Sequence, residues 1–235
     1  MNLLDLTLPS PAENLACDEA LLDACEAGGP EVLRFWEARN HFVVVGYGNH
    51  AATEVEVEAC RREGVPILRR CSGGGTVVQG PGCLNYAVVL RIESNPAWQT
   101  IPGANRAIME RNRAALESLL GRSVRVRGFT DLALGELKFS GNAQRRHRQA
   151  LLFHGTFLLD FDLGLIQRLL PMPSKQPDYR LDRAHEQFVT NLKVPAAEVK
   201  RALSGAWGGT ASLSEPPDFG GLLAEKYNRT EWNMR

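Results

Sequence analysis

The stretch of sequence that decides the fold is Arg69-Arg70-Cys71-Ser72-Gly73-Gly74-Gly75-Thr76-Val77, a basic segment that runs into three glycines. Each glycine weakens regular structure by roughly 0.5–1 kcal/mol, so a triplet indicates a purpose for the backbone itself. Without Cβ atoms, its N–H groups can surround an anion, and the Arg69 and Arg70 guanidinium groups add positive charge beside them. A flexible hairpin turn with two solvated arginines would suit the same residues. The loop alone therefore leaves both interpretations open, although it is neither a P-loop nor a Gly-x-Gly-x-x-Gly fingerprint.

The segments around this loop predict alternating strands and helices. We expect strands over residues 32–36, 42–45, 66–69, 84–90, 124–127, 132–139 and 151–161. We expect helices over 13–27 (amphipathic), 105–120 (ended by Gly121), 195–203 and 220–227, and a short helix started by Asp162 and Gly164. Thr53 and Glu56 predict a capping box that opens a helix through about Arg62. Because no regular βαβ rhythm emerges, the sequence favours an α+β fold, a mixed, mostly antiparallel sheet with packed helices.

Composition narrows the possible classes of protein. The chain has 235 residues, 44% of them hydrophobic, and no composition shift, so we expect one domain over residues 1–235. Lys plus Arg equals Asp plus Glu at 27 each, which argues against nucleic-acid binding. No basic leader and no run of roughly 18 apolar residues is present, so we expect neither a signal peptide nor a membrane span. The irregularly spaced cysteines, which suit a reduced cytoplasmic protein and form no zinc pattern, are Cys17, Cys25, Cys60, Cys71 and Cys83.

Two further motifs follow the glycine loop. The first is Lys138-Phe139-Ser140-Gly141-Asn142-Ala143, whose lysine by itself would be an ordinary solvated cation. The second is His154-Gly155-Thr156 inside an apolar run, where a histidine is more often a hydrogen-bonded core residue than a catalytic base. Each motif is a moderate signal, and their order and spacing carry the weight.

Taken together, these motifs resemble the lipoate–protein ligase A family, within the biotin/lipoate ligase superfamily. The resemblance rests on the glycine loop, the lysine motif and the histidine motif, in that order. It extends to Asn14-Leu15-Ala16, Leu33-Arg34-Phe35-Trp36, Val43-Val44-Val45-Gly46, Leu84-Asn85-Tyr86, Asp131-Leu132, Thr190-Asn191-Leu192, Lys226-Tyr227 and Glu231-Trp232. It therefore spans nearly the whole chain and implies the catalytic domain of such ligases, without their accessory C-terminal domain.

The resemblance implies an activity and a set of site residues. Such a ligase activates lipoate or octanoate with ATP and Mg²⁺ to an acyl-AMP, and transfers the acyl group to a lysine of a lipoyl carrier domain. The carrier would be a 2-oxoacid dehydrogenase acyltransferase subunit, a glycine cleavage H protein or a similar protein. We hypothesise in addition that activation or transfer needs a separate accessory subunit. Lys138 would be catalytic, and the metal ligands stay unknown. The residues expected to bind nucleotide and acyl group are Arg70, Ser72, Gly73, Gly74, Gly75, Thr76, Val77, Val78, Asn85, Asp131, His154 and Thr156.

One segment departs from the family's pattern. The family follows its glycine loop with His-Asp and an Asn-containing turn, whereas this chain has Gln79-Gly80-Pro81-Gly82-Cys83. Loss of these polar groups puts the geometry of nucleotide binding in doubt. The glycines are uninterrupted by arginine, which makes a biotin ligase less plausible.

Three alternatives remain open. A related octanoyltransferase would act through a cysteine thioester, but in those enzymes the cysteine follows the lysine motif, and here every cysteine precedes Lys138. A noncatalytic acyl- or nucleotide-binding subunit would have less need of Lys138. The basic stretch Arg145-Arg146-His147-Arg148 predicts a solvated hairpin loop, with a docking surface for an acidic carrier as its alternative.

Overall fold

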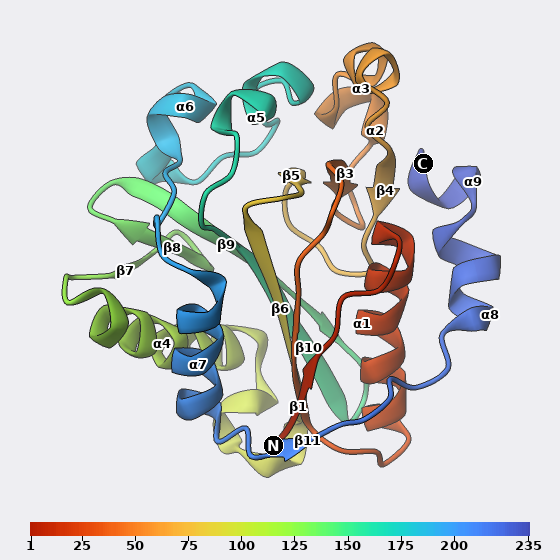
Figure 1. Cartoon of the computed structure of the whole chain (residues 1–235), viewed down its shortest axis with the longest axis vertical. Coiled ribbons are helices and arrows are strands. Elements are labelled where there is room, and N and C mark those ends of the chain that lie inside the picture. Colours follow the sequence, from red (N-terminus) through yellow and green to blue (C-terminus); the bar gives the residue numbers. More distant parts are fainter.

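The main sheet has eight strands in the order β11-β1-β2-β6-β10-β9-β8-β7 in the computed structural model, which describes residues 1–235 (Figure 1). The strands are β1 (Asn2–Asp5), β2 (Val32–Trp36), β6 (Cys83–Arg91), β7 (Arg125–Arg127), β8 (Asp131–Leu134), β9 (Leu137–Arg146), β10 (Ala150–Leu158) and β11 (Ala211–Ser212). Only β1 pairs in parallel, with β2 and β11, and all other neighbours are antiparallel. The prediction of a mixed, mostly antiparallel sheet is confirmed.

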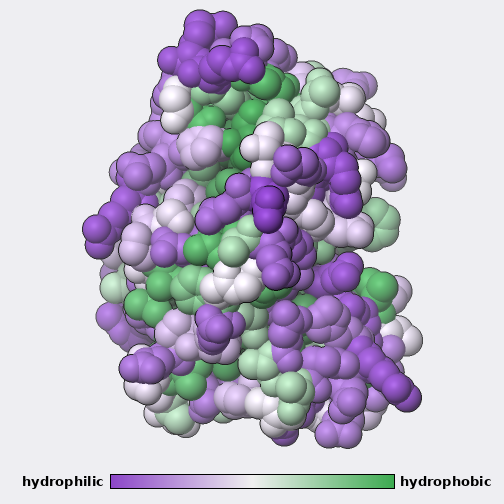
Figure 2. All heavy atoms as spheres, turned by 90° about the vertical axis from the view of Figure 1, so that its right-hand side faces the viewer, coloured by the Kyte–Doolittle hydropathy of each residue, from purple (hydrophilic) through white to green (hydrophobic).

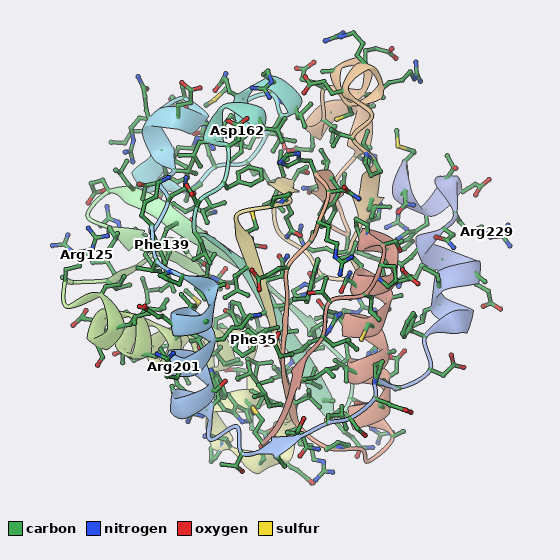
Figure 3. The ribbon with its side chains drawn as sticks, viewed as in Figure 1. Phe35, Arg125, Phe139, Asp162, Arg201 and Arg229 are labelled. Atoms are coloured by element: carbon green, nitrogen blue, oxygen red, sulfur yellow. The ribbon has the colours of Figure 1, made fainter.

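Helices cover both faces of this sheet. On one face, α4 (Ile101–Leu120) and α7 (Ala196–Trp207) pack over a core that includes Val88 of β6. On the other face, α1 (Pro11–Glu26) packs over Ala87 and Val89 of the same strand. Because both faces are covered, β6 is buried along nearly its whole length, which explains why its sequence is apolar from Tyr86 to Leu90. Figure 3 shows Phe35 and Phe139 inside the molecule and Arg125, Arg201 and Arg229 at its periphery.

A second sheet of three strands holds the glycine loop. Its order is β4 (Ile67–Arg69), β3 (Phe42–Val45) and β5 (Val77–Gln79), with β4 parallel and β5 antiparallel to β3. Residues 70–76 join the two outer strands, so they cross over the end of β3. One face packs on α2 (Ala51–Glu54), α3 (Val57–Glu63) and α5 (Leu163–Leu169), and the other packs on α1.

The C-terminal residues lie against α1 and β4. They form α8 (Gly220–Leu222), a π-helical turn over Leu223–Tyr227 and α9 (Thr230–Asn233). Lys226 Nζ and Tyr227 Oη both donate to the carboxylate of Glu19 on α1, at 2.7 and 2.6 Å. Figure 2 shows the side of the molecule that carries these helices, where hydrophilic residues surround smaller hydrophobic patches.

Several predicted elements need correction. The capping box is wrong: α2 ends at Glu54, and α3 begins after Glu56 with no side-chain cap. The predicted strand 132–139 is two strands, because Gly135 at a φ of 60° turns the chain between β8 and β9. The first helix is placed correctly but is not amphipathic, since it is buried between the main sheet, the small sheet and the C-terminal residues.

The basic stretch after the lysine motif is only partly a loop. Strand β9 runs through Arg146, because Arg145 and Arg146 pair with Leu152 and Leu151 of β10. The Arg145 guanidinium lies 5.5 Å from the centre of the Tyr47 ring, and Arg146 donates to the Trp98 carbonyl at 2.8 Å.

No helix is both long and apolar enough to cross a membrane.

Candidate functional site

A cavity of about 390 Å³ lies between the glycine loop, strands β9 and β10 of the main sheet, and residues 170–189, which we call the cover segment. The cover segment contains a 3₁₀ turn (Asp178–Arg180) and α6 (His185–Phe188). The predicted site residues that line this cavity are Arg70, Gly74, Gly75, Thr76, Val77, Val78, Asn85, Asp131, Lys138, His154 and Thr156. Ser72 and Gly73 do not line it. Segments up to about 85 residues apart therefore meet where the sequence predicted a common site.

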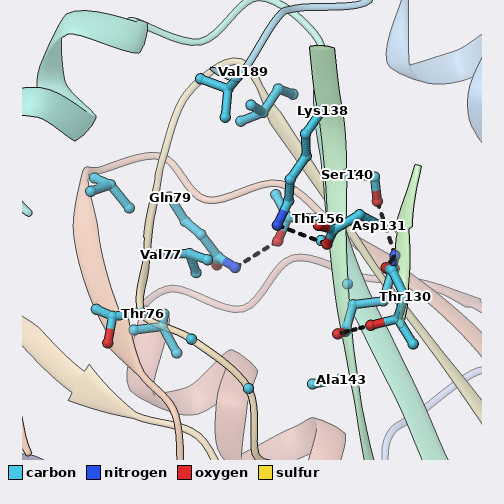
Figure 4. A pocket seen from close by; sticks show the side chains of 18 of the residues that line it. Thr76, Val77, Gln79, Thr130, Asp131, Lys138, Ser140, Ala143, Thr156 and Val189 are labelled. Carbon is cyan, nitrogen blue, oxygen red and sulfur yellow. Dashed lines mark hydrogen bonds and ion pairs between the residues drawn. The ribbon is translucent and has the colours of Figure 1, made fainter. Parts of the chain in front are cut away.

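Lys138 reaches into the cavity in an ion pair with Asp131, the first residue of β8 (Figure 4). The distance from Lys138 Nζ to Asp131 Oδ1 is 2.8 Å, and Tyr179 of the cover segment donates its hydroxyl to Asp131 Oδ2 at 2.8 Å. A Cβ atom at position 141 would lie 2.8 Å from Lys138 Nζ, so Gly141 leaves the room that the ammonium occupies. Burial, followed by the charge of Asp131, raises the pKa of Tyr179 far above its usual value. Tyr179 therefore stays a neutral hydrogen-bond donor.

A chain of three polar side chains lines the wall beside Lys138. Gln79 Nε2 donates to Thr156 Oγ1 at 2.6 Å, and Thr156 Oγ1 donates to Asn85 Oδ1 at 2.6 Å (Figure 4 shows the first of these bonds). Gln79 Oε1 and Asn85 Nδ2 are buried without a partner. Gln79, which the sequence identified only as a departure from the family, thus belongs to the site. Its signal was a polar residue at the end of an otherwise apolar strand.

Arg70 stabilises the glycine loop through hydrogen bonds to the loop residues. Its guanidinium donates to the carbonyl groups of Gly73 and Gly75 and to Ser72 Oγ. No carboxylate lies within ion-pair distance of Arg70, and burial lowers its pKa to about 10, so it remains a cation at neutral pH. The close packing of the loop also needs Gly46, because a Cβ atom there would lie 2.1 Å from the carbonyl oxygen of Gly74.

The expectation for Arg69 is wrong. Its side chain turns away from the loop and donates to carbonyl groups of residues 46–49 and of the C-terminal residues, including Trp232 at 2.8 Å. The side chain is fully buried there and adds no charge to the cavity. Adjacent residues on a strand point to opposite faces, so only one of the two arginines can face the loop.

Ser72 and His154 belong to a buried network behind the cavity wall. The distance from Ser72 Oγ to His154 Nε2 is 2.5 Å, and His154 Nδ1 lies 3.4 Å from Asp18 Oδ2. Asp18 also pairs with Arg34 at 2.5 Å. Burial alone would raise the pKa of Asp18, but Arg34 and His154 outweigh it and hold this pKa below its usual range. His154 is therefore a hydrogen-bonded core residue that also presents an edge to the cavity.

No cysteine lines the cavity, and all five are free and buried. Burial raises the pKa of Cys71 and of Cys83 to about 12, so neither is a thiolate at neutral pH. No cluster of three or more His, Cys, Asp or Glu side chains is arranged to hold a metal ion.

Comparison with known proteins gives consistent matches. Residues 10–206 match the family model of the lipoyl protein ligase A/B catalytic domain. A relative from Aeropyrum pernix that is named as a lipoate-protein ligase A is 34% identical to this chain. The match covers 72% of this chain and only 61% of that relative. Lipoate-protein ligase A subunit 1 of Thermoplasma acidophilum is 27% identical, over 94% of this chain and 91% of the relative. Octanoyltransferase LipM of Geobacillus kaustophilus is 29% identical, over 96% and 94%.

Solved structures agree with the fold. A lipoate-protein ligase A bound with ATP has a TM-score of 0.85 at 27% identity, covering 99% of this chain and 98% of the other. A Thermoplasma acidophilum protein with bound lipoic acid has a TM-score of 0.83 at 26% identity, covering 99% and 98%. The bi-partite lipoate protein ligase of the same archaeon, studied with its E2 lipoyl domain, has a TM-score of 0.83 at 26% identity, covering 99% and 95%.

Proposed function

The chain belongs to the lipoyl protein ligase A/B catalytic-domain family, and we propose on that basis that it is an ATP-dependent lipoate–protein ligase. In this proposal residues 1–235 act as one catalytic domain. They activate lipoate or octanoate to an acyl-AMP and transfer the acyl group to a lysine of a lipoyl carrier domain. The observation that carries the proposal is that Lys138 and the glycine loop meet in one cavity. That ATP and lipoic acid occur in structural relatives of this chain supports the same assignment.

Activation requires two anions to come together. A carboxylate oxygen of the acid attacks the α-phosphorus of ATP, a new P–O bond forms, and the bond to pyrophosphate breaks. Negative charge on the α-phosphate grows as this happens. The Lys138 ammonium stabilises that charge, while the backbone N–H groups of residues 74–78 and Arg70 hold the nucleotide.

Transfer releases the nucleotide again. The neutral amine of a carrier lysine attacks the acyl carbonyl carbon, the amide bond forms, and AMP leaves with the electrons of the broken acyl–oxygen bond. The attacking nitrogen loses its extra proton to solvent or to a neighbouring base. The apolar part of the cavity wall, which includes Leu15, Trp36 and Val44, offers a surface for the acyl chain.

Mg²⁺ fits this site as part of the nucleotide. Mg²⁺ usually keeps several waters and is held by one or two carboxylates together with substrate phosphates, so no preformed cage is needed. Asp131, which faces the cavity beside Lys138, is the carboxylate that would hold it. Bound Mg²⁺ neutralises phosphate charge during activation.

An octanoyltransferase is the second candidate, because relatives named LipM match nearly the whole chain. That reaction needs a cysteine nucleophile, which must be accessible and able to form a thiolate. The burial of all five thiols, none of which lines the cavity, favours the ligase.

The test is to incubate the purified chain with lipoate, MgATP and a panel of carrier domains. The panel includes an acyltransferase lipoyl domain and a glycine cleavage H protein. We expect pyrophosphate release, and a gain of one lipoyl group by intact mass that requires ATP. Each reaction is run with and without a candidate accessory subunit, since one relative is named subunit 1 of its ligase. Transfer of octanoate between carriers without ATP, with a mass shift on Cys71 or Cys83, would establish the transferase instead.

A further inference from the structure

The cover segment is tied to the Lys138 site at two points. Val189 pairs with Lys138 in a β-bridge, and the Thr190 amide donates to the Lys138 carbonyl at 2.8 Å. Tyr179 donates to Asp131, the ion-pair partner of Lys138. The segment therefore forms a wall of the same cavity, opposite the glycine loop.

Arg180 is a buried cation in this wall that makes no ion pair with the protein. It is only 4% exposed and lines the cavity, and no carboxylate lies within ion-pair distance of it. Its Nε donates to the Arg183 carbonyl at 3.0 Å, and Nη2 lies 3.5 Å from Met172 Sδ. These are the side-chain hydrogen bonds that the guanidinium donates within the protein, and the residue lines the cavity. The guanidinium lies 4.8 Å from the centre of the Phe188 ring, which fixes its plane.

Such an arrangement is costly without a ligand. A buried charge that lacks a partner loses favourable solvation. Burial lowers the pKa of Arg180, with nearby Arg183 adding to the effect. Arginine nevertheless stays charged at neutral pH and has no ion-pair partner in the protein, so it is available to bind an anion inside the cavity.

The charges already present indicate which anion this is. The glycine loop and Lys138 are engaged with the α-phosphate and the acyl carboxylate in the proposed function. A triphosphate carries further negative charge, which one Mg²⁺ ion would offset only in part. Arg180 and the exposed Lys175 are the remaining cationic side chains that line the cavity, and guanidinium binds phosphate oxygens in pairs.

We propose that Arg180 receives the terminal phosphates of ATP, the ones that leave as pyrophosphate, from the wall opposite the glycine loop. This assignment rests on the proposed function, and it makes Arg180 a binding residue that distinguishes ATP from AMP. Lys175 adds a second, more exposed positive charge at the same wall.

The chain supplies a matched control three residues away. Arg183 also stacks on Phe188, at 5.3 Å, and also donates to cover-segment carbonyl groups, among them that of Arg180. Arg183 does not line the cavity. A purely structural role for these arginines predicts the same effect from Arg180→Met and Arg183→Met, whereas phosphate binding predicts an effect from Arg180→Met alone.

The experiment measures the affinities of ATP and AMP for each variant by calorimetry, with Mg²⁺ and without lipoate, so that no reaction takes place. We expect Arg180→Met to weaken ATP binding about 10- to 100-fold, as for the loss of a hydrogen bond to a charged group. AMP binding should stay within about twofold, because AMP lacks the terminal phosphates. Arg183→Met should leave the ratio of the two affinities unchanged.

The outcomes separate this inference from the proposed function. If the unmodified chain binds ATP and Arg180→Met leaves the ATP-to-AMP ratio unchanged, the assignment of Arg180 is overturned and the ligase proposal stands. If the unmodified chain binds no adenine nucleotide with or without the candidate accessory subunit, the ligase proposal itself fails. Arg180→Gln keeps an N–H donor for the Arg183 carbonyl but removes the charge. It should show the same loss of the ratio, and it serves if the methionine variant does not fold.

Discussion

Replacing Lys138 by alanine removes the ammonium group that pairs with Asp131 inside the cavity. If that group stabilises the charge that grows on the α-phosphate, the barrier to activation should rise by about 2.7–4 kcal/mol, the usual cost of losing one such donor. This corresponds to a loss of roughly 10²- to 10³-fold in kcat/KM for pyrophosphate release. The effect on folding should be small, because the lysine side chain is 25% exposed and Asp131 keeps its bond from Tyr179. An ion pair of this kind contributes about 1 kcal/mol or less to stability.

The assay compares initial rates of pyrophosphate release, with the free energy of unfolding measured on the same preparations. Lys200→Ala is the matched control. Lys200 is ion-paired at 2.9 Å to Asp5 and at 2.7 Å to Glu37, its side chain is 19% exposed, and it does not line the cavity. We expect it to lose similar stability and no activity. Release by Lys138→Ala within tenfold of the unmodified chain would refute the role given to this residue.

Three other changes test the site and the fold. Gly46→Ala should weaken ATP binding by at least about tenfold, because a Cβ atom there collides with the glycine loop. Gly48→Ala is the control and should bind ATP normally, because a Cβ atom at position 48 meets open space. Equal binding of ATP by both variants would contradict the packing described. Replacing Cys71 and Cys83 together by alanine should leave ligation of lipoate within about threefold of normal, measured by carrier mass, and abolished transfer would instead favour a thioester mechanism. Burial holds the pKa of His185 below its usual value of 6.5, so the unfolded chain binds the proton first as the pH falls. The free energy of unfolding should therefore decrease as the pH falls below about 6.5. Denaturant titrations of His185→Gln should show a smaller decrease, and a decrease equal to that of the unmodified chain would contradict this role of His185.

The sequence predicted the elements whose local pattern and tertiary environment agree. The strands at residues 32–36 and 42–45 were correct to the residue because their apolar runs are buried on both faces. Thr53 and Glu56 had the residue types of a capping box, but the chain turns at Val55 and separates two short helices. The sequence pattern also predicted one strand in place of β8 and β9, since the single glycine at position 135 does not by itself predict a hairpin turn.

The residues that were expected in one site line one cavity, apart from Ser72 and Gly73, whereas the cover segment was not predicted. Lys138, Asp131 and the glycine loop were expected to meet, and they do. Ser72 was expected in the binding wall and instead lies behind it, bonded to His154, because its direction depends on how the loop closes. Tyr179 and Arg180 escaped notice because residues 170–184 have no periodic pattern. Only the fold brings that segment against β9.

Because every cysteine is buried, the rate of thiol labelling reports how often each part of the fold opens. A thiol reagent attacks an accessible thiolate, so each sulfur reacts only while the segment around it is open. The sulfurs are distributed over different parts of the fold, with Cys25 on α1, Cys60 on α3, Cys71 in the glycine loop and Cys83 at the start of β6. The labelling rate at Cys71, compared with that at Cys25, therefore measures the opening of the glycine loop separately from the opening of the core. Labelling of the unmodified sequence is therefore enough to compare the opening of the glycine loop with and without added ATP.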